Sequence, residues 1–349
     1  MKKDNIGVIC LKGTENIAKH LSEYLIDCEI LRFKTGEAKA ILKENIKYKQ
    51  IYILVDVCNN SIEYEINNYK NHMSPDDYYQ DLKRVIDVVK KQTDKIIIIM
   101  PYLYEGRQVK RFLDESSDCC MFLNELFNLG INSIITFDAH DSNIKNMVSS
   151  NKIQSIKTGY YLLKGLFDEV KDLDINSDNL IIVSPDKGAI ERSKYISEVL
   201  KVNFGFFEKR RDYTEIVSCE YHGDSVYNKD IIIIDDMISS GETILTAAEK
   251  LKQKNAKRIF VLCSFGLFTN GLKNFDEAYK KGIINKIITT NLTYQKSELF
   301  TKLYYKCIDM SEEIAKLIVE INSRNSIDDL DCCDSELKEL INKYKNYQK

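Results

Sequence analysis

Several residue types are scarce or absent in this chain of 349 residues, which contains no tryptophan and only three prolines. Its formal net charge is −3, whereas nucleic acids and anionic membranes attract strongly basic proteins, so we expect neither as a main partner. No apolar run approaches the roughly 20 residues that a membrane-spanning helix needs. The apolar stretch at the N-terminal end is short and interrupted by Gly7, so we expect no secretory leader.

The cysteines indicate neither disulfides nor a zinc site. Ten cysteines with no sign of secretion predict reduced thiols and a cytoplasmic location. The adjacent pairs Cys119-Cys120 and Cys332-Cys333 lack the spacing of zinc ligands, so we assign them no metal. The chain is 44% hydrophobic and 30% charged, which is typical of soluble globular proteins, and its length suits about two domains.

Apolar runs alternate with amphipathic helical patterns along most of the chain. The runs that predict strands are 51–57, 96–100, 131–137, 180–183, 231–234, 259–263 and 286–290. Helical periodicity is present at 79–91, 120–129, 189–200 and 244–254. Strands separated by single helices imply βαβ units and parallel sheets, and ligands of such sheets bind at the edge formed by the loops after the strands.

The alternation of predicted strands and helices falls into two halves of the chain. We expect an N-terminal domain of residues 1–155 and a second domain of residues 156–320. Residues 321–349 are polar and acidic and then helical with basic residues, so we interpret them as a C-terminal appendage.

The most informative segment runs from Ile231 to Thr243. Four isoleucines predict a strand buried on both faces, and the apolar run ends at Asp235 and Asp236. A short loop follows, and apolar residues at helical spacing begin at Ile244. Two adjacent carboxylates at the carboxyl end of a strand suit a pair of sugar hydroxyls, or a Mg²⁺ ion shared with a phosphate.

The loop of this segment has the composition of a phosphate site. Hydroxyl side chains and the backbone N–H groups at the start of a helix can hold the anion, and glycine lets the backbone approach it. The residues concerned are Ser239, Ser240, Gly241 and Thr243. A buried strand capped by aspartate is the ordinary alternative, but strand, double acid, hydroxyl loop and helix occur here together and in order. The segment resembles the phosphoribosyl-diphosphate (PRPP) signature of type I phosphoribosyltransferases.

Two further loops follow predicted strands and carry metal-type side chains. The first is Ser-Pro-Asp-Lys-Gly-Ala at 184–189, which can bind pyrophosphate through backbone N–H groups with Asp186 near the metal, or can be a plain turn. The second is Phe-Asp-Ala-His-Asp at 137–141. His140 can bind a metal there, or can be a cap or a core residue.

Two basic segments can bind ATP. In the loop at 101–108, Arg107 can engage phosphate or stack on a base and Gln108 can bind a base edge, although the loop can also be merely solvated. Lys209-Arg210-Arg211 can be a solvated face, or can cover a phosphate chain and neutralise the charge of the transition state.

In this order, these segments resemble the ribose-phosphate pyrophosphokinase (PRPP synthetase) family, from about residue 6 to about residue 318. The resemblance implies an α/β fold of two tandem phosphoribosyltransferase-type domains, each with a central, mostly parallel sheet flanked by helices. It also implies transfer of the β,γ-diphosphoryl group of ATP to the 1-hydroxyl of ribose 5-phosphate, which gives PRPP and AMP. Mg²⁺ carried by ATP and assembly into a homo-oligomer, a dimer or a hexamer, are further implications.

The resemblance assigns roles position by position. ATP binding falls to Phe33, Glu37, Arg107 and Gln108. Metal binding falls to His140 and Asp186, and the pyrophosphate loop is Asp186, Lys187 and Gly188. The catalytic cations, on a mobile loop, are Lys209 and Arg211. Ribose 5-phosphate binding falls to Asp235, Asp236, Ser239, Ser240, Gly241, Glu242 and Thr243.

The chain departs from the family pattern at several of these positions. Most members carry aspartate where this chain has Ser239 and a small residue where it has Glu242, whose carboxylate would repel a phosphate unless it pointed outward. Lys187 replaces a small or apolar residue, and Val109 stands where an acid is common. The region 59–77 is longer than the connection usual in the family.

Two other functions remain open from the sequence. A catalytically weak homologue would bind nucleotide and act as a regulatory or partner subunit, but such a protein need not keep all the catalytic and sugar-binding residues. A phosphoribosyltransferase would consume PRPP, but the tandem architecture and the Arg-Gln and Asp-Ala-His loops argue against it. We therefore expect the active diphosphokinase.

Overall fold

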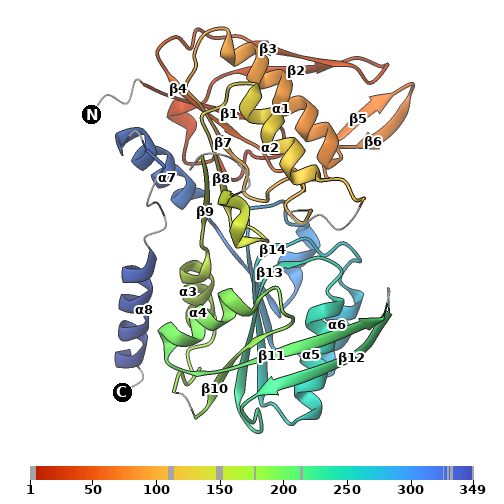
Figure 1. Ribbon diagram of the computed structural model, residues 1–349, viewed down its shortest axis with the longest axis vertical. Coiled ribbons are helices and arrows are strands. Elements are labelled where there is room, and N and C mark those ends of the chain that lie inside the picture. Colours follow the sequence, from red (N-terminus) through yellow and green to blue (C-terminus); the bar gives the residue numbers. More distant parts are fainter. Residues whose placement is uncertain are drawn as a thin grey trace. The chain divides into compact units, whose positions relative to one another are not determined.

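The computed structural model (Figure 1) describes residues 5–108, 114–146, 152–176, 178–212, 215–324, 326–327, 330 and 333–347, without side chains at 209–218, 333–334 and 347. The chain forms two compact units. Unit 1 contains residues 1–156, 291–294 and 309–331, and unit 2 contains residues 157–290, 295–308 and 332–349.

Unit 1 is built on a five-stranded sheet in which every pair of neighbours is parallel. In spatial order its strands are β1 (Ile6–Cys10), β4 (Gln50–Leu54), β7 (Ile96–Ile99), β8 (Ser133–Phe137) and β9 (Ile153–Ile156). The helices of this unit are α1 (Pro75–Lys90), α2 (Asp118–Asn128) and α7 (Ser311–Arg324). Strands β4 and β7 are buried throughout, as their apolar runs predict.

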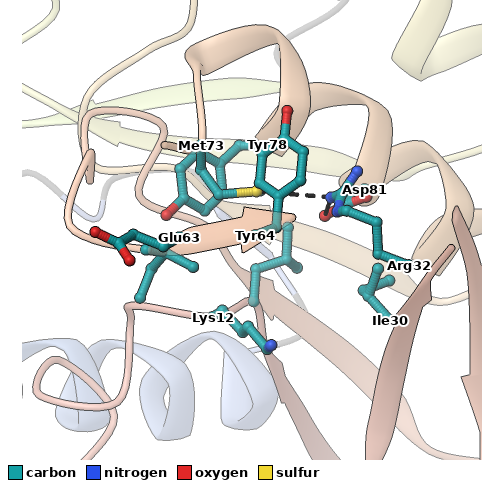
Figure 2. A pocket seen from close by; sticks show the side chains of 10 residues that line it. Lys12, Ile30, Arg32, Glu63, Tyr64, Met73, Tyr78 and Asp81 are labelled. Carbon is teal, nitrogen blue, oxygen red and sulfur yellow. Dashed lines mark hydrogen bonds and ion pairs between the residues drawn. The ribbon is translucent and has the colours of Figure 1, made fainter. Parts of the chain in front are cut away.

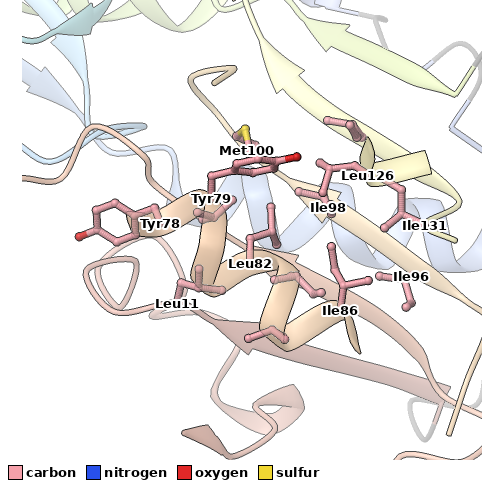
Figure 3. Packing of buried hydrophobic residues seen from close by; sticks show 14 of the residues in the cluster. Leu11, Tyr78, Tyr79, Leu82, Ile86, Ile96, Ile98, Met100, Leu126 and Ile131 are labelled. Atoms are coloured by element: carbon pink, nitrogen blue, oxygen red, sulfur yellow. The ribbon is translucent and has the colours of Figure 1, made fainter. Parts of the chain in front are cut away.

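Helix α1 shows how the sequence fixes these elements. Ser74 and Asp77 form a reciprocal capping box, and Pro75 occupies the first helical position, where its missing N–H costs nothing. The helix then directs one apolar face, including Leu82 and Ile86, towards β7 and α2 (Figure 3).

Two antiparallel ribbons lie outside this sheet. The first consists of β2 (Cys28–Arg32) and β3 (Ala38–Leu42), and the second of β5 (Glu63–Ile66) and β6 (Tyr69–His72). The apolar runs of the sequence predicted neither ribbon, because both alternate half-buried and exposed residues with many charges. The second ribbon lies within the region 59–77 that looks longer than the family's connection.

Unit 2 contains a seven-stranded sheet that is parallel except where β11 and β12 pair. In spatial order its strands are β12 (Glu215–Gly223), β11 (Asn203–Asp212), β10 (Leu180–Ser184), β13 (Asp230–Ile238), β14 (Arg258–Gly266), β15 (Lys286–Thr290) and β16 (Tyr305–Ile308). Its helices are α3 (Gly159–Glu169), α4 (Ile190–Leu200), α5 (Glu242–Gln253), α6 (Lys273–Lys280) and α8 (Cys333–Tyr347). Helices α5 and α6 cover one face, and α3, α4 and α8 cover the other.

The fold class expected from the sequence is confirmed: two α/β units, each with a mostly parallel central sheet flanked by helices. All seven predicted strands and all four predicted helices are present. A 3₁₀ turn at Ser142–Asn146 follows β8. Two more 3₁₀ turns lie at Ser22–Tyr24 and Ser297–Thr301.

The domain ranges expected from the sequence differ from the two units. Unit 1 also contains residues 291–294 and 309–331. The sequence had placed these residues in the second domain and in the C-terminal appendage. The end of the chain is not an appendage, because α8 packs into the core of unit 2. Tyr344 stacks on Phe167 with ring centroids 4.1 Å apart, and its hydroxyl donates to the carbonyl of Val170 at 2.7 Å.

Candidate active site

Strand β13 carries the two aspartates of the predicted sugar site. Strand β10 pairs with it only as far as Ile233, whereas β14 stays paired through Ile238. Asp235 and Asp236 therefore lie within the strand, beyond its last pair with β10. Asp235 is half-buried, Asp236 is 3% exposed, and the Asp236 N–H donates to Oδ1 of Asp235 at 2.9 Å. The prediction that this strand ends at Ile234 was wrong, because β14 continues to supply backbone partners.

Three ionisable side chains interact with Asp235. Burial, then the neighbouring Asp236, and then Asp186 of the loop after β10 raise the pKa of Asp235 well above its usual value. Arg192, in the first turn of α4, lowers that pKa. Arg192 was not predicted from the sequence. Its place in the first turn of the helix that follows the Ser-Pro-Asp loop was the available signal.

Gly241 shapes the loop between β13 and α5. Its φ of +86° lies in the left-handed region, which side chains rarely adopt. A Cβ atom at this position would lie 2.2 Å from a ring carbon of Phe275, which is fully buried. Glycine is therefore required here by both the backbone and the packing.

The hydroxyl residues of this loop surround the start of α5. Ser239 accepts the Thr269 N–H on its carbonyl at 3.0 Å, and Ser240 Oγ accepts the Glu242 N–H at 3.4 Å. Thr243 lies in the first turn and is half-buried. Because the first N–H groups of a helix have no acceptor within the helix, this turn is suited to bind an anion. The Glu242 side chain is exposed.

The loop between β10 and α4 is a tight turn. Ser184 Oγ donates to the carbonyl of Asp186 at 2.6 Å, and the Gly188 N–H donates to Oδ1 of Asp186 at 2.9 Å. Lys187 and Glu208 of β11 form an exposed ion pair at 2.6 Å. The turn thus places Asp186 next to Asp235 and points Lys187 towards the base of the β11–β12 ribbon.

The cations proposed for catalysis lie on a ribbon and not on a loop. Lys209 pairs with Cys219 and Arg211 pairs with Ile216, and the register shifts between Arg210 and Arg211. A register shift of this kind bends a strand locally. Only the backbone of these three cations is described. The expected mobile loop is therefore, over the described residues, an antiparallel extension of the sheet.

In unit 1, the loop after β7 carries two of the expected ATP residues. Pro101 accepts hydrogen bonds on its carbonyl from the end of β8, and the Tyr104 hydroxyl donates to Asp76 of α1 at 2.6 Å. Arg107 and Gln108 follow this anchored part and are exposed. Val109 lies outside the described residues. The loop is held at Tyr104 and presents its polar end to solvent.

His140 follows the neighbouring strand β8. The Asp138 N–H donates to the carbonyl of Ile156 at 2.9 Å, and the Ala139 N–H donates to Ser155 Oγ at 3.0 Å. His140 itself is exposed. Because β7 and β8 are adjacent and parallel, the loops that carry Arg107 and His140 leave the same edge of the sheet.

The other two expected ATP residues are on the β2–β3 ribbon. Phe33 and Glu37 close its turn, since the Phe33 N–H donates to the carbonyl of Glu37 at 2.7 Å. Phe33 is 46% exposed, with the Lys39 ammonium 5.8 Å from its ring centroid. The described ribbon pairs with no strand of the five-stranded sheet. Phe33 and Glu37 therefore lie on a different structural element from Arg107 and Gln108, which follow β7 of that sheet.

Three general properties hold for the described residues alone. Among them, no three His, Cys, Asp or Glu residues gather into a group able to hold a metal ion. The eight cysteines with described side chains form no disulfide. None of the described helices is both long and apolar enough to cross a bilayer.

Comparison with known proteins adds to this geometry. A family model for the N-terminal domain of ribose phosphate pyrophosphokinase matches residues 10–130, and one for the phosphoribosyl synthetase-associated domain matches residues 218–331. The chain belongs to the ribose-phosphate pyrophosphokinase family. The resemblance noted in the sequence is thereby confirmed.

Members of this family match nearly the whole chain. The ribose-phosphate pyrophosphokinase of Mycoplasmopsis pulmonis is 28% identical over 307 residues, which is 85% of this chain and 86% of the relative. That of Staphylococcus epidermidis is 26% identical and covers 93% of this chain and 97% of the relative. The crystal structure of phosphoribosylpyrophosphate synthetase from Mycobacterium smegmatis matches with a TM-score of 0.76 at 19% identity. That match covers 92% of this chain and 100% of the other, and it supports the shared fold.

Proposed function

We propose that this protein is an ATP-dependent ribose-phosphate diphosphokinase. It transfers the β,γ-diphosphoryl group of ATP to the 1-hydroxyl of ribose 5-phosphate and releases PRPP and AMP. The observation that carries the proposal is the β13–α5 junction, where two carboxylates lead directly into a glycine-dependent loop and a helix start. Relatives that match over most of their length bear the name of this enzyme.

The junction suits ribose 5-phosphate from two sides. Asp235 and Asp236 accept hydrogen bonds from the 2- and 3-hydroxyls of the sugar. The 5-phosphate is bound by the loop Ser239, Ser240, Gly241, Glu242 and Thr243. Hydroxyl donors suit Asp235 in particular. Burial and then the neighbouring Asp236 raise the pKa of Asp235, and each hydroxyl donor stabilises its ionised form.

The loop after β10 binds the diphosphate. Backbone N–H groups near Lys187 and Gly188 face the anion, and Asp186 is the Mg²⁺ ligand of this unit. His140 is the Mg²⁺ ligand proposed for unit 1, and the Mg²⁺ is carried by ATP. After burial and Asp236, Asp186 also raises the pKa of Asp235, so a cation bound at Asp186 would be stabilised by the negative charge nearby. Carboxylate oxygens are preferred ligands of Mg²⁺. When bound, Mg²⁺ neutralises charge on the phosphate oxygens.

Catalysis needs alignment and charge stabilisation but no covalent enzyme intermediate. The 1-hydroxyl oxygen loses its proton to solvent and forms a bond to the β-phosphorus, while the bond from that phosphorus to the oxygen of AMP breaks. Lys209 and Arg211 offset the negative charge that develops on the transferred group. The ribbon that carries them starts beside the diphosphate loop, because β11 pairs with β10 over residues 203–206.

The adenine base is bound by Arg107 and Gln108 and by Phe33 and Glu37. Exposed aromatic and guanidinium groups offer stacking surfaces, and Gln108 and Glu37 offer hydrogen bonds to the base edge. We also propose that the protein is cytoplasmic, in agreement with the eight cysteines whose side chains are described and which form no disulfide. We further propose that it acts as a homo-oligomer, a dimer or a hexamer.

The alternative is a weak homologue that binds nucleotide and regulates a partner. Glu242 favours this alternative, because its carboxylate stands at the first position of the helix that would receive the 5-phosphate. Its exposed side chain favours the enzyme, because an exposed carboxylate is well screened by water.

The test is to incubate the purified chain with ATP, ribose 5-phosphate and Mg²⁺ and to measure AMP and PRPP. We expect equal amounts of both products and a loss of several orders of magnitude in Lys209→Ala, with little change in ribose 5-phosphate binding. A folded protein that binds ATP but forms neither product would favour the regulatory homologue.

A further inference from the structure

The two ribbons of unit 1 meet at their tips. The Asn67 N–H in the β5–β6 turn donates to the carbonyl of Lys34 in the β2–β3 turn at 2.9 Å. The Ile66 side chain packs against Gly36, where a Cβ atom would lie 3.0 Å from Ile66 Cδ1. Figure 1 shows the two tips side by side. The contacts therefore fall on the turn between Phe33 and Glu37.

The β5–β6 hairpin is fastened to α1 at its other end. The Tyr64 hydroxyl lies 3.2 and 3.3 Å from the two carboxylate oxygens of Asp77, which belongs to the capping box of α1. The fully buried Tyr78 of the same helix donates its hydroxyl to the carbonyl of Asn59 at 2.7 Å. The hairpin thus connects a rigid helix to the turn of the other ribbon.

Arg32 makes a second connection between the ribbons. It is the last residue of β2 and directly precedes Phe33. Its guanidinium lies 4.5 Å from the centroid of the Tyr64 ring, and its Nη2 donates to Oδ2 of the buried Asp81 at 2.6 Å. The charged group is thus held between the hairpin and α1, as Figure 2 shows.

A cavity of about 60 Å³ remains beneath these contacts, lined by residues of both ribbons and of α1. Figure 2 shows Ile30 and Arg32 on one side of it and Tyr64 and Met73 on another. A space of this size holds a few water molecules. Because this space is not filled by side chains, the angle between the ribbons depends on the contact of Ile66 with Gly36 and on the directional contacts of Arg32, Tyr64 and Asn67.

We propose that the β5–β6 hairpin is a brace that holds the turn from Phe33 to Glu37 in position, so that its residues set the affinity for the base of ATP without touching it. This inference rests on the proposed role of Phe33 and Glu37 in binding adenine. A two-stranded ribbon is marginally stable by itself. Without the brace its turn would be less ordered before ATP binds, and the free energy needed to order the turn would weaken ATP binding.

Two variants of the full-length protein test the brace, with a matched control. Tyr64→Ala with Ile66→Ala removes the contacts to Arg32 and Gly36, and Tyr64→Phe removes only the hydroxyl contact to Asp77. Tyr69→Ala is the control, because Tyr69 lies on the same hairpin and is 75% exposed. The measurements are hydrogen exchange of the Phe33 and Gly36 amides, equilibrium binding of Mg-ATP, and steady-state kinetics.

In the double variant we expect faster exchange of both amides and a rise in the dissociation constant and KM for ATP of roughly tenfold. We expect kcat and the KM for ribose 5-phosphate to stay within about twofold of the wild type. Tyr64→Phe should show a smaller change in the same direction and Tyr69→Ala none. This division between KM and kcat marks positioning residues, whereas a general loss of folding would lower all activities together.

The outcomes separate the brace from the proposed function. Unchanged exchange in the double variant, or equal effects in Tyr69→Ala, would overturn the brace even in an active enzyme. Faster exchange with unchanged ATP affinity would also overturn it. If the folded wild type neither binds ATP nor forms AMP, the proposed function fails, and the role of the brace in base binding fails with it.

Discussion

The proposed ribose 5-phosphate site of unit 2 lies in one short stretch of chain, whereas the proposed nucleotide and metal residues of unit 1 are distributed over three separate segments. In unit 2 the double acid, the glycine turn and the helix start follow one another from β13 into α5. In unit 1 the proposed ATP residues stand on the β2–β3 turn and on the loop after β7, and the proposed metal ligand His140 stands on the loop after β8. The first arrangement needs one βα junction to be correct, and the second needs several elements to be held relative to one another.

This difference shows where each site is vulnerable. A sugar-phosphate site within one junction depends on local backbone geometry, so a single atom in the wrong place disrupts it. A nucleotide site spread over loops and a ribbon depends on anchoring contacts, such as that of Tyr104 with Asp76, each of which contributes modestly. Substitutions in the two units test this contrast, from the largest expected effect to the smallest.

Gly241→Ala should have the largest effect. The new methyl group would overlap the ring of Phe275 in a backbone conformation that disfavours side chains. We expect a loss of roughly 2–5 kcal/mol in the free energy of unfolding and loss of ribose 5-phosphate binding. Chemical denaturation and calorimetric titration with ribose 5-phosphate measure both.

Gly271→Ala is the matched control, because Gly271 also has a left-handed backbone, with φ of +75°, but has no atom within 4 Å of the place that a methyl group would occupy. It should cost only about 1 kcal/mol and leave sugar binding intact. Equal effects of the two substitutions would mean that Phe275 does not shape the phosphate loop.

Asp56 provides a contrasting buried carboxylate in unit 1. Within the part of the chain that the structure describes, backbone N–H groups and not a cation hold it. It accepts hydrogen bonds from the N–H groups of Cys58 at 3.0 Å and Tyr294 at 2.6 Å, and burial raises its pKa to about 7. Because the unfolded state loses this proton near pH 4, the folded state binds more protons between about pH 4 and 7. The contribution of Asp56 to stability is therefore largest at low pH and declines through this window.

This linkage is measured against Asp56→Asn, which cannot titrate. The free energy of unfolding of the wild type, minus that of the variant, should fall by up to about 4 kcal/mol between pH 4 and 7. A difference that is constant with pH would show that Asp56 is ionised throughout and that its two N–H donors outweigh burial.

Arg192→Met tests the charge cluster of unit 2. Since Arg192 lowers the pKa of Asp235, its loss should raise that pKa further and favour the protonated carboxyl. We expect the KM for ribose 5-phosphate to rise roughly tenfold near neutral pH and the acid limb of its pH profile to move to higher pH. Arg192→Lys should keep most of the wild-type profile, and a profile that stays in place in Arg192→Met would exclude this coupling.

Tyr104→Phe should give the smallest change. It removes the hydrogen bond to Asp76 but keeps the ring, which stacks on Tyr79 with centroids 4.9 Å apart. We expect a loss of about 1 kcal/mol in stability and a two- to fivefold rise, roughly, in the KM for ATP. A change in the KM for ribose 5-phosphate instead would contradict the division of the substrates between the two groups of residues.

The same contrast explains what the sequence could predict. The strand at Lys286–Thr290 was predicted with its observed bounds, and β13 and α5 were found, because continuous apolar runs and helical periodicity are local signals. The ribbons were missed because their strands are half-exposed and rich in Lys and Glu. Glu63 and Lys70, for example, pair across the second ribbon and give no apolar pattern.

The sequence also did not predict features that form only when a later part of the chain packs against an earlier part. Nothing local indicates that residues 291–294 and 309–331 rejoin unit 1. The docking of α8 did have a signal, since Leu337, Ile341 and Tyr344 recur at helical spacing and are buried. Arg192 could be recognised as a neighbour of Asp235 only from the packing of α4 against β13. Ser193 of the same helix turn shows this packing, because its hydroxyl donates to the carbonyl of Ile234 at 3.1 Å.

The most direct measurement follows the fate of the β-phosphorus. ATP labelled at that atom is incubated with ribose 5-phosphate, Mg²⁺ and the purified chain, and the products are separated. Transfer of the diphosphoryl group predicts that the label leaves with PRPP, that AMP is unlabelled, and that both appear in equal amounts. Label retained in ADP, or left in ATP by a folded protein that binds both substrates, would contradict the proposed reaction.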